Sequence, residues 1–281
     1  MFEYEKINRR SFLAAAGLTA AALALTACGG SASSTASSTA SSAASSEAAS
    51  TSAAAELTTV EAGKLTMATN AAFPPYEMTT DAGEFEGIDI DTAKAIAEKL
   101  GLELQIDDMD FDAALLSVQQ GKADIVMAGV TVTDERKAVM DFSDSYATGI
   151  QSIIVPEGSD ITSPDDLAGK KIGTQRGTTG YIYCSDDFGD DAVVAYDDGL
   201  TAVQALNNGQ VDAVVIDNAP AKEFVAANPG LVILDTSYAE EDYAIGLAKG
   251  SALEDAVNAA LEELKADGTL QSIVDKYINA E

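Results

Sequence analysis

The sequence predicts an α/β protein with mainly parallel sheet, divided into two lobes. From Leu57 onward, short apolar strands alternate with amphipathic helices, which implies helical layers packed around parallel sheet. A unit of helix end, glycine and apolar strand also occurs twice, in residues 119–128 and 207–216. Ligands of open α/β sheets bind beyond the carboxyl ends of strands, so two copies suggest two lobes facing one cleft. The unit is common, and a chance echo is the alternative.

The first half of the folded region is expected to hold three strands and three helices. The clearest helix has apolar residues on one face from Ile90 and stops at Gly101. We expect Asp112 to cap the helix that follows, and a short helix to begin after Thr133. The expected strands are 64–69, 102–106 and 123–127, and the longer expected helices are 90–100 and 112–121.

The second half continues the alternation. Pro220 occupies a favoured first-turn position of its helix, and Gly268 divides the last two helices. The expected strands are 152–155, 171–174, 193–196, 211–216, 232–234 and 244–248, and the expected helices are 179–188, 200–208, 220–227, 253–266 and 269–278.

Composition excludes several classes of function. The 281 residues include 16 Lys and Arg, 46 Asp and Glu, no histidine and two cysteines, for a net charge of −30. A nucleophile activated by histidine and a zinc site of Cys and His are therefore excluded. The negative charge opposes binding to nucleic acid. The acidic stretch 186–191 lacks the spaced ligands of a calcium loop, so we expect no metal and no cofactor.

Residues 1–28 have the pattern of an export signal. Basic Arg9 and Arg10 precede an apolar stretch, Phe12 to Ala27, that is shorter than the roughly 20 residues needed to span a bilayer. The stretch ends in LTAC, which looks like a bacterial lipobox and predicts lipidation of Cys28. The paired arginines also resemble a twin-arginine signal, which leaves the export route open. The alternative is a buried helix with a structural cysteine.

A flexible tether, 29–56, is expected to follow. Up to Ala55 it contains only Gly, Ser, Ala and Thr apart from Glu47. Such a segment cannot bury enough apolar surface to offset its ordering entropy. We therefore expect a lipid anchor, a tether and then a folded region from residue 57, in which Cys184 has no partner for a disulfide.

Two strand-to-helix turns are candidates for binding an anion. Residues 129–136 follow a strand and open a helix, where backbone N–H groups favour an anion and Arg136 adds a bidentate grip on a carboxylate. The alternative is a surface arginine paired with Asp134 or Glu135. Residues 173–180 form a second turn that would meet the same anion from the other side. They lack the motif of a phosphate loop, and an ordinary capped turn is the alternative.

Other side chains are candidates for the rest of a ligand. Asp217 directly follows an apolar strand, where its carboxylate would suit an ammonium group. Its alternative role is to cap the helix that contains Pro220. The stiff, proline-containing loop after Asn70 presents Phe73, which with Phe111 would sandwich an apolar stem. Core packing is the alternative for both rings.

Six motifs in order resemble one protein family. They are FPPY at 73–76, GIDID at 87–91, MDFD at 109–112, AGVTVTDER at 128–136, DFSD at 141–144 and GTT at 177–179. Their order and spacing are similar to those of the family 3 extracellular solute-binding proteins of polar amino-acid ABC importers. The match runs from about Leu65 to the C-terminus.

The resemblance implies the type II periplasmic-binding-protein-like fold, with two lobes joined by two hinge strands. Lobe 1 would be 57–146 plus 245–281, and lobe 2 would be 147–244. The lobes would close on a free L-amino acid, and the protein would be no enzyme. The implied roles are these: Arg136 with the N–H groups of Thr131 and Thr179 for the α-carboxylate; Asp217, the carbonyl of Ala128 or Gly129 and the Thr131 hydroxyl for the α-ammonium; Phe73 and Phe111 beside the side chain; and Asn70 and Gln175 for specificity.

The same resemblance indicates the ligand class and the partners. Several members have Asp where this chain has Asn70, so we expect a neutral polar ligand rather than a cationic one. The partners would be permease subunits with their ATPase, and the membrane through the lipid anchor. We expect an extracytoplasmic monomer. One alternative is a periplasmic cyclohexadienyl or arogenate dehydratase on the same scaffold, with Glu77 as the acid; another is a sensor or lytic-enzyme input domain.

Overall fold

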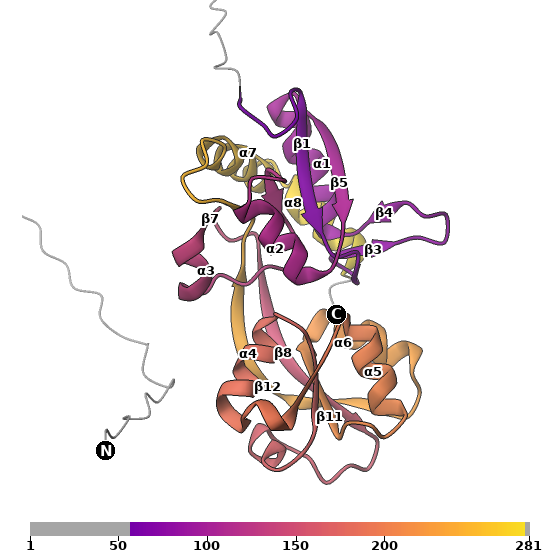
Figure 1. The fold of residues 1–281 in the computed structure, drawn as a ribbon. Helices are drawn as coiled ribbons and strands as arrows, with labels where there is room; N and C mark the ends of the chain where they lie inside the picture. Colours follow the sequence, from indigo (N-terminus) through magenta and orange to yellow (C-terminus); the bar gives the residue numbers. More distant parts are fainter. Residues whose placement is uncertain (1–56, 279–281) are drawn as a thin grey trace, which may run out of the picture. The chain divides into compact units, whose positions relative to one another are not determined.

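The computed structural model, which describes residues 57–278, contains two five-stranded sheets (Figure 1). We call the parts built on these sheets the first lobe and the second lobe. Both belong to one compact unit of the chain. The predicted export signal with Cys28 and the predicted tether lie outside the described residues. Within the described residues, no helix has the length and apolar character that crossing a membrane requires.

The first lobe contains the sheet β5-β1-β6-β13-β7. Its β1 pairs in parallel with β5 and β6, while β13 returns to this sheet from far along the chain and pairs antiparallel with β6 and β7. The strands are β1 (Lys64–Thr69), β5 (Glu103–Asp108), β6 (Ile125–Val126), β7 (Met140–Phe142) and β13 (Gly246–Ala248), and the helices are α1 (Ile88–Leu100), α2 (Phe111–Gln119), α3 (Asp134–Val139), α7 (Glu254–Ala266) and α8 (Thr269–Tyr277).

The second lobe contains the sheet β10-β9-β11-β8-β12. Strands β10, β9 and β11 run parallel, whereas β8 pairs antiparallel with both β11 and β12. The strands are β8 (Ala147–Pro156), β9 (Ile172–Gln175), β10 (Val193–Tyr196), β11 (Ala213–Asp217) and β12 (Leu231–Tyr243), and the helices are α4 (Thr179–Phe188), α5 (Gly199–Asn207), α6 (Asn218–Ala227) and the short 3₁₀ turns η1 (Pro164–Leu167) and η2 (Asp190–Ala192).

Strands β8 and β12 lie side by side and connect the two lobes (Figure 1). At the first lobe, Tyr243 of β12 forms an antiparallel bridge with Thr131, and the N–H of Ala244 donates to the carbonyl of Val130 over 3.1 Å. A Cβ on Gly149 of β8 would lie 2.5 Å from the Tyr243 ring, so this close approach requires glycine. The expectation of two hinge strands is therefore confirmed.

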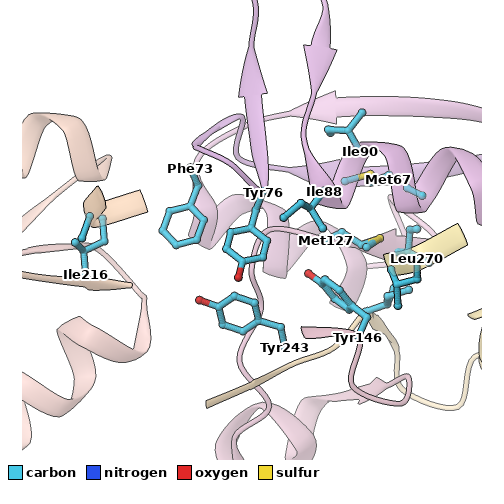
Figure 2. Close-up of a cluster of buried hydrophobic side chains, with 14 of the residues drawn as sticks. Met67, Phe73, Tyr76, Ile88, Ile90, Met127, Tyr146, Ile216, Tyr243 and Leu270 are labelled. Atoms are coloured by element: carbon cyan, nitrogen blue, oxygen red, sulfur yellow. The ribbon is translucent and has the colours of Figure 1, made fainter. Parts of the chain in front are cut away.

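Tyr243 also belongs to an aromatic cluster beside the hinge (Figure 2). Its ring meets Tyr76 edge-on, with centroids 5.3 Å apart, and Tyr76 in turn stacks with Phe73 at 5.9 Å. Figure 2 shows the Tyr243 hydroxyl directed toward the side where Ile216 of β11 lies. The cluster thus places the phenol of Tyr243 close to the end of β11 in the second lobe.

The repeated unit of helix, glycine and strand is confirmed. It joins α2 to β6 through Gly121 and α5 to β11 through Gly209, and both glycines have φ of 66°. The strands of the two sheets also fall on either side of the predicted boundaries at 146/147 and 244/245. Those boundaries stay a prediction.

Two expectations about local structure were wrong, and one sheet was not expected. Asp112 does not cap α2, because the N-cap position belongs to Asp110. Strand β12 runs far beyond the expected 232–234, since β8 provides a partner along acidic residues that rarely favour strands by themselves. The unexpected element is the small sheet β2-β3-β4, whose strands are β2 (Ala72–Phe73), β3 (Glu77–Thr79) and β4 (Phe85–Glu86).

Candidate functional site

A small cavity lies where strand ends of the two lobes meet. Its volume is about 20 Å³, room for roughly one water molecule. A free amino acid is much larger, so side chains or lobes must move apart to admit one. All ten residues that the sequence singled out line this cavity: Asn70, Phe73, Phe111, Ala128, Gly129, Thr131, Arg136, Gln175, Thr179 and Asp217, joined by Glu77 and Thr178.

Arg136 forms a positive end of the cavity. Helix α3 places it in its first turn, where its N–H donates to the N-cap Thr133 over 3.2 Å. The guanidinium is buried and donates to the carbonyls of Thr131 (2.8 Å) and Gly177 (3.1 Å). Burial lowers the pKa of Arg136, and nearby Glu241 opposes that shift. The alternative of an exposed surface pair is therefore wrong, because the charge lies buried between the lobes.

The start of α4 adds backbone donors to this positive end. Thr178 caps the helix by accepting from the N–H of Tyr181 over 3.3 Å, which leaves Thr179 in the first turn, facing the cavity. The preceding Gly177 has φ of 73°, and a Cβ there would lie 1.6 Å from Oδ1 of Asp112. The second lobe therefore approaches α2 of the first lobe so closely that only glycine fits.

Asp217 forms a negative end. It is buried at the end of β11, where the Tyr243 hydroxyl donates to Oδ1 and Nε2 of Gln151 donates to Oδ2 over 2.8 Å. Burial raises the pKa of Asp217 to about 7, with the charge of Glu241 adding to the shift. The alternative role as a helix cap is wrong: Asp217 occupies the N-cap position of α6, but its side chain makes no capping hydrogen bond.

A third part of the cavity contains neutral amides and a buried acid. Nδ2 of Asn70 donates to the carbonyl of Met109 over 2.9 Å, and its Oδ1 accepts from Nε2 of Gln175 over 2.8 Å, which links the lobes. Glu77 is fully buried, and burial together with the charge of Asp89 raises its pKa well above its ordinary value. Asp89 accepts from the N–H of Gly129 over 3.0 Å, and burial raises its pKa to about 6.

Sequence reasoning missed the side chains that surround Asp217. Gln151, Glu241 and Tyr243 are buried polar or aromatic residues on the hinge strands. None of them stands at a turn, a glycine-rich loop or a helix start, so no local signal marked them. Glu77 was noticed in the sequence, but only as an alternative acid.

Two α/β lobes joined by two strands, with a buried polar cavity between them, define a type II binding protein that encloses a small ligand. The chain belongs to the bacterial extracellular solute-binding proteins, family 3, whose family model matches residues 65–280. Members of this family are extracytoplasmic by description.

Individual relatives agree with this assignment. The chain is 32% identical to a probable histidine-binding protein of Neisseria gonorrhoeae, with 98% of each chain covered. It is 35% identical to an ABC transporter glutamine-binding protein of Bacillus subtilis, over 70% of this chain and 74% of that one. A solved ancestral arginine-binding protein bound to glutamine matches with a TM-score of 0.74 and 43% identity, covering 78% of this chain and 99% of that one. All three are named as binding proteins rather than enzymes.

Proposed function

We propose that this protein is the substrate-binding component of an amino-acid ABC importer, and that it holds a free L-amino acid between its lobes. The observation that carries the proposal is the pairing of charges in one cavity, with Arg136 at one end and Asp217 at the other. A zwitterion leaves water at low cost only if both of its charges are paired. The two hinge strands would let the lobes close on the ligand. The permease and its ATPase would then recognise the closed form.

A binding experiment tests this function directly. We expect one or a few of the common amino acids to raise the melting temperature of the folded region, with saturable binding in calorimetry. Mass spectrometry should recover the ligand unchanged. Absence of binding by every amino acid would contradict the proposal. Conversion of prephenate or arogenate would favour the dehydratase alternative, which the names of the relatives do not support.

For the side chain of the ligand, we propose a neutral polar group. Asn70 and Gln175 are neutral, and each amide both donates and accepts hydrogen bonds. They already pair with each other across the cleft, so a ligand amide would insert into an existing polar pair. The glutamine bound to the ancestral relative and the glutamine-binding relative support this class.

A cationic side chain is a second candidate, favoured by Glu77. This buried carboxyl lines the cavity, and its hydrogen-bond partner is another carboxyl, that of Asp89, rather than a cation. The two candidates differ in proton linkage. A bound guanidinium would lower the pKa of Glu77 and expel its proton, whereas a ligand amide would not. Both ligands share the α-ammonium and its effect on Asp217, so calorimetry in two buffers with different ionisation heats measures the Glu77 release as the excess for L-arginine over L-glutamine. Glu77→Gln should abolish this excess.

We also propose that lipidated Cys28 anchors the protein to the membrane, with 29–56 as the tether and the folded region as a monomer. The support is the LTAC sequence at the end of an apolar stretch. Replacing Cys28 with Ser should release the protein into the soluble fraction, because the acyl chains supply the attachment. Cys184→Ser is the matched control and should stay with membranes. Equal membrane retention of the Cys28→Ser protein would refute the anchor.

A further inference from the structure

Three neighbouring strands bring polar side chains together behind the cavity. In the sheet order β11-β8-β12, Asp217 of β11 stands opposite Gln151 of β8. On β12, Glu241 and Tyr243 are buried while Asp242 between them is exposed. Alternate residues of a strand face the same side, so Glu241 shares the face of Tyr243, whose hydroxyl reaches Asp217. A buried cluster of two carboxyls, one amide and one phenol results.

The hydrogen bonds of Glu241 have a forced direction. A carboxylate only accepts, so the Thr131 hydroxyl, 3.0 Å from Oε2 of Glu241, must donate its single hydrogen to it. Nε2 of Gln151 donates to the same oxygen over 3.1 Å and to Asp217 over 2.8 Å. Both amide hydrogens of Gln151 are thereby used, and the carboxyls of Asp217 and Glu241 are held on either side of it.

Thr131 lines the cavity, and the direction of its hydrogen bond to Glu241 determines what its hydroxyl can offer a ligand. Because its hydrogen points at Glu241, its hydroxyl oxygen has only lone pairs to offer. One of them faces Oγ1 of Thr179 at 3.4 Å, and another is available to a ligand. An oxygen that only accepts suits an ammonium group, which only donates, and it disfavours a group without a hydrogen to give.

Glu241 also lacks a full set of donors. Its side chain is 6% exposed, and among the described residues its Oε1 has no hydrogen-bond partner. Among the described residues, Arg136 is the buried cation that interacts with Glu241, so one buried positive charge faces the two buried carboxyls of Asp217 and Glu241. An unsatisfied buried carboxylate oxygen is costly, and a positive ligand group nearby offsets that cost.

We propose that Glu241 is a positioning residue of the amino-acid site, which acts through Thr131 to make the cavity select ligands with an α-ammonium group. The inference rests on the proposed function and deepens it. Glu241 does not line the cavity itself, so its effect on the ligand runs through the orientation of the Thr131 hydroxyl.

The test compares amino acids with their deaminated analogues. Calorimetry measures L-glutamine against glutaramate and L-arginine against 5-guanidinopentanoate, with competition titration for weak ligands. We expect Glu241→Gln to weaken the preferred amino acid about 10- to 100-fold, the cost of one charge-assisted hydrogen bond, and the analogue much less. The preference for the amino acid should shrink accordingly. Glu240→Gln is the matched control, because Glu240 is its exposed neighbour, and it should retain the wild-type preference.

A double-mutant cycle separates this role from a structural one. If Glu241 acts through Thr131, adding Glu241→Gln to Thr131→Val should cost little beyond Thr131→Val alone. An equal loss for the amino acid and its analogue, or full additivity in the cycle, would overturn the inference. If Glu241→Gln does not fold, Glu241→Asp carries the test, because its shorter side chain keeps the charge but withdraws the acceptor from the Thr131 hydroxyl, and it should show the same loss of preference. Wild-type protein that binds no amino acid would instead overturn the proposed function.

Discussion

The two charged ends of the cavity are built in different ways. The guanidinium of Arg136 belongs to the first lobe and donates to Gly177 of the second lobe, so the positive end is completed across the cleft. The carboxylate of Asp217 accepts from Gln151 and Tyr243, which lie on strands of its own sheet. The negative end is therefore held ready in one sheet, whereas the positive end depends on the lobes coming together. Closure and recognition of the α-carboxylate should be coupled.

Removing the guanidinium should have the largest effect on binding. We expect Arg136→Ala to weaken amino-acid binding by about 2–5 kcal/mol, because the ligand carboxylate would then be buried without its charge partner. Stability without ligand should change much less, and calorimetry measures both. Arg176→Ala is the control, since Arg176 lies on the neighbouring turn but is exposed and pairs with Asp197 at 3.7 Å. Wild-type affinity in the Arg136 variant would refute its role.

Removing the carboxylate should weaken binding to a comparable or smaller degree. We expect Asp217→Asn to weaken the binding free energy by about 2–5 kcal/mol, toward the lower end, because Gln151 and Tyr243 remain to orient the new amide. The loss should be greater for amino acids than for their deaminated analogues. An equal loss for both would place the ammonium elsewhere.

The raised pKa of Asp217 predicts that the stability of the ligand-free protein depends on pH. The pKa of Asp217 rises from 3.8 to about 7 on folding, so the folded state holds its proton more tightly. Its contribution to stability is present below about pH 4 and is lost as the pH rises through about 7. The melting temperature of the ligand-free protein should therefore fall between these values, and fall less in Asp217→Asn. Asp89, with a pKa raised to about 6, adds a decline in the same direction. A steeper decline in the variant would contradict this assignment.

A single glycine allows a direct test of closure. A Cβ at Gly177 would collide with Asp112 across the cleft, so we expect Gly177→Ala to weaken binding about tenfold or more by holding the lobes apart. Gly158→Ala is the matched control: its φ of 80° imposes a similar backbone cost, but no atom lies within 4 Å of its Cβ position. Small-angle scattering with ligand should show a less compact Gly177 variant. Equal affinity in both variants would rule out the coupling.

The smallest effect is expected at the side-chain end. Asn70→Asp should improve binding of L-arginine relative to L-glutamine, by about 1 kcal/mol or less, because the added charge attracts the guanidinium but loses the bond to Met109. Ligand-induced thermal shift across the common amino acids measures the change in ranking. If the wild-type protein already prefers arginine over every neutral amino acid, Glu77 is the carboxylate responsible.

The turns of the site could be predicted because each one is a local structure. Arg136 and Thr179 lie in the first turns of helices that follow strands, and Asp217 ends a strand of Val and Ile, so neighbouring residues define each position. The sequence likewise determined the α/β alternation and the glycines that end α2 and α5. These features depend on backbone geometry and apolar periodicity within a few residues, so the local sequence is enough to predict them.

Only the tertiary structure decided what surrounds the carboxylate of Asp217. Asp217 and Glu241 lie 66 and 90 positions after Gln151, and the three meet because β8 lies between β11 and β12. Strand order depends on the packing of whole lobes and on which edges find partners, and no local pattern in the sequence encodes it. For the same reason the length of β12 could not be foreseen: its acidic residues pair with β8 because the two strands connect the lobes, not because of their own propensity.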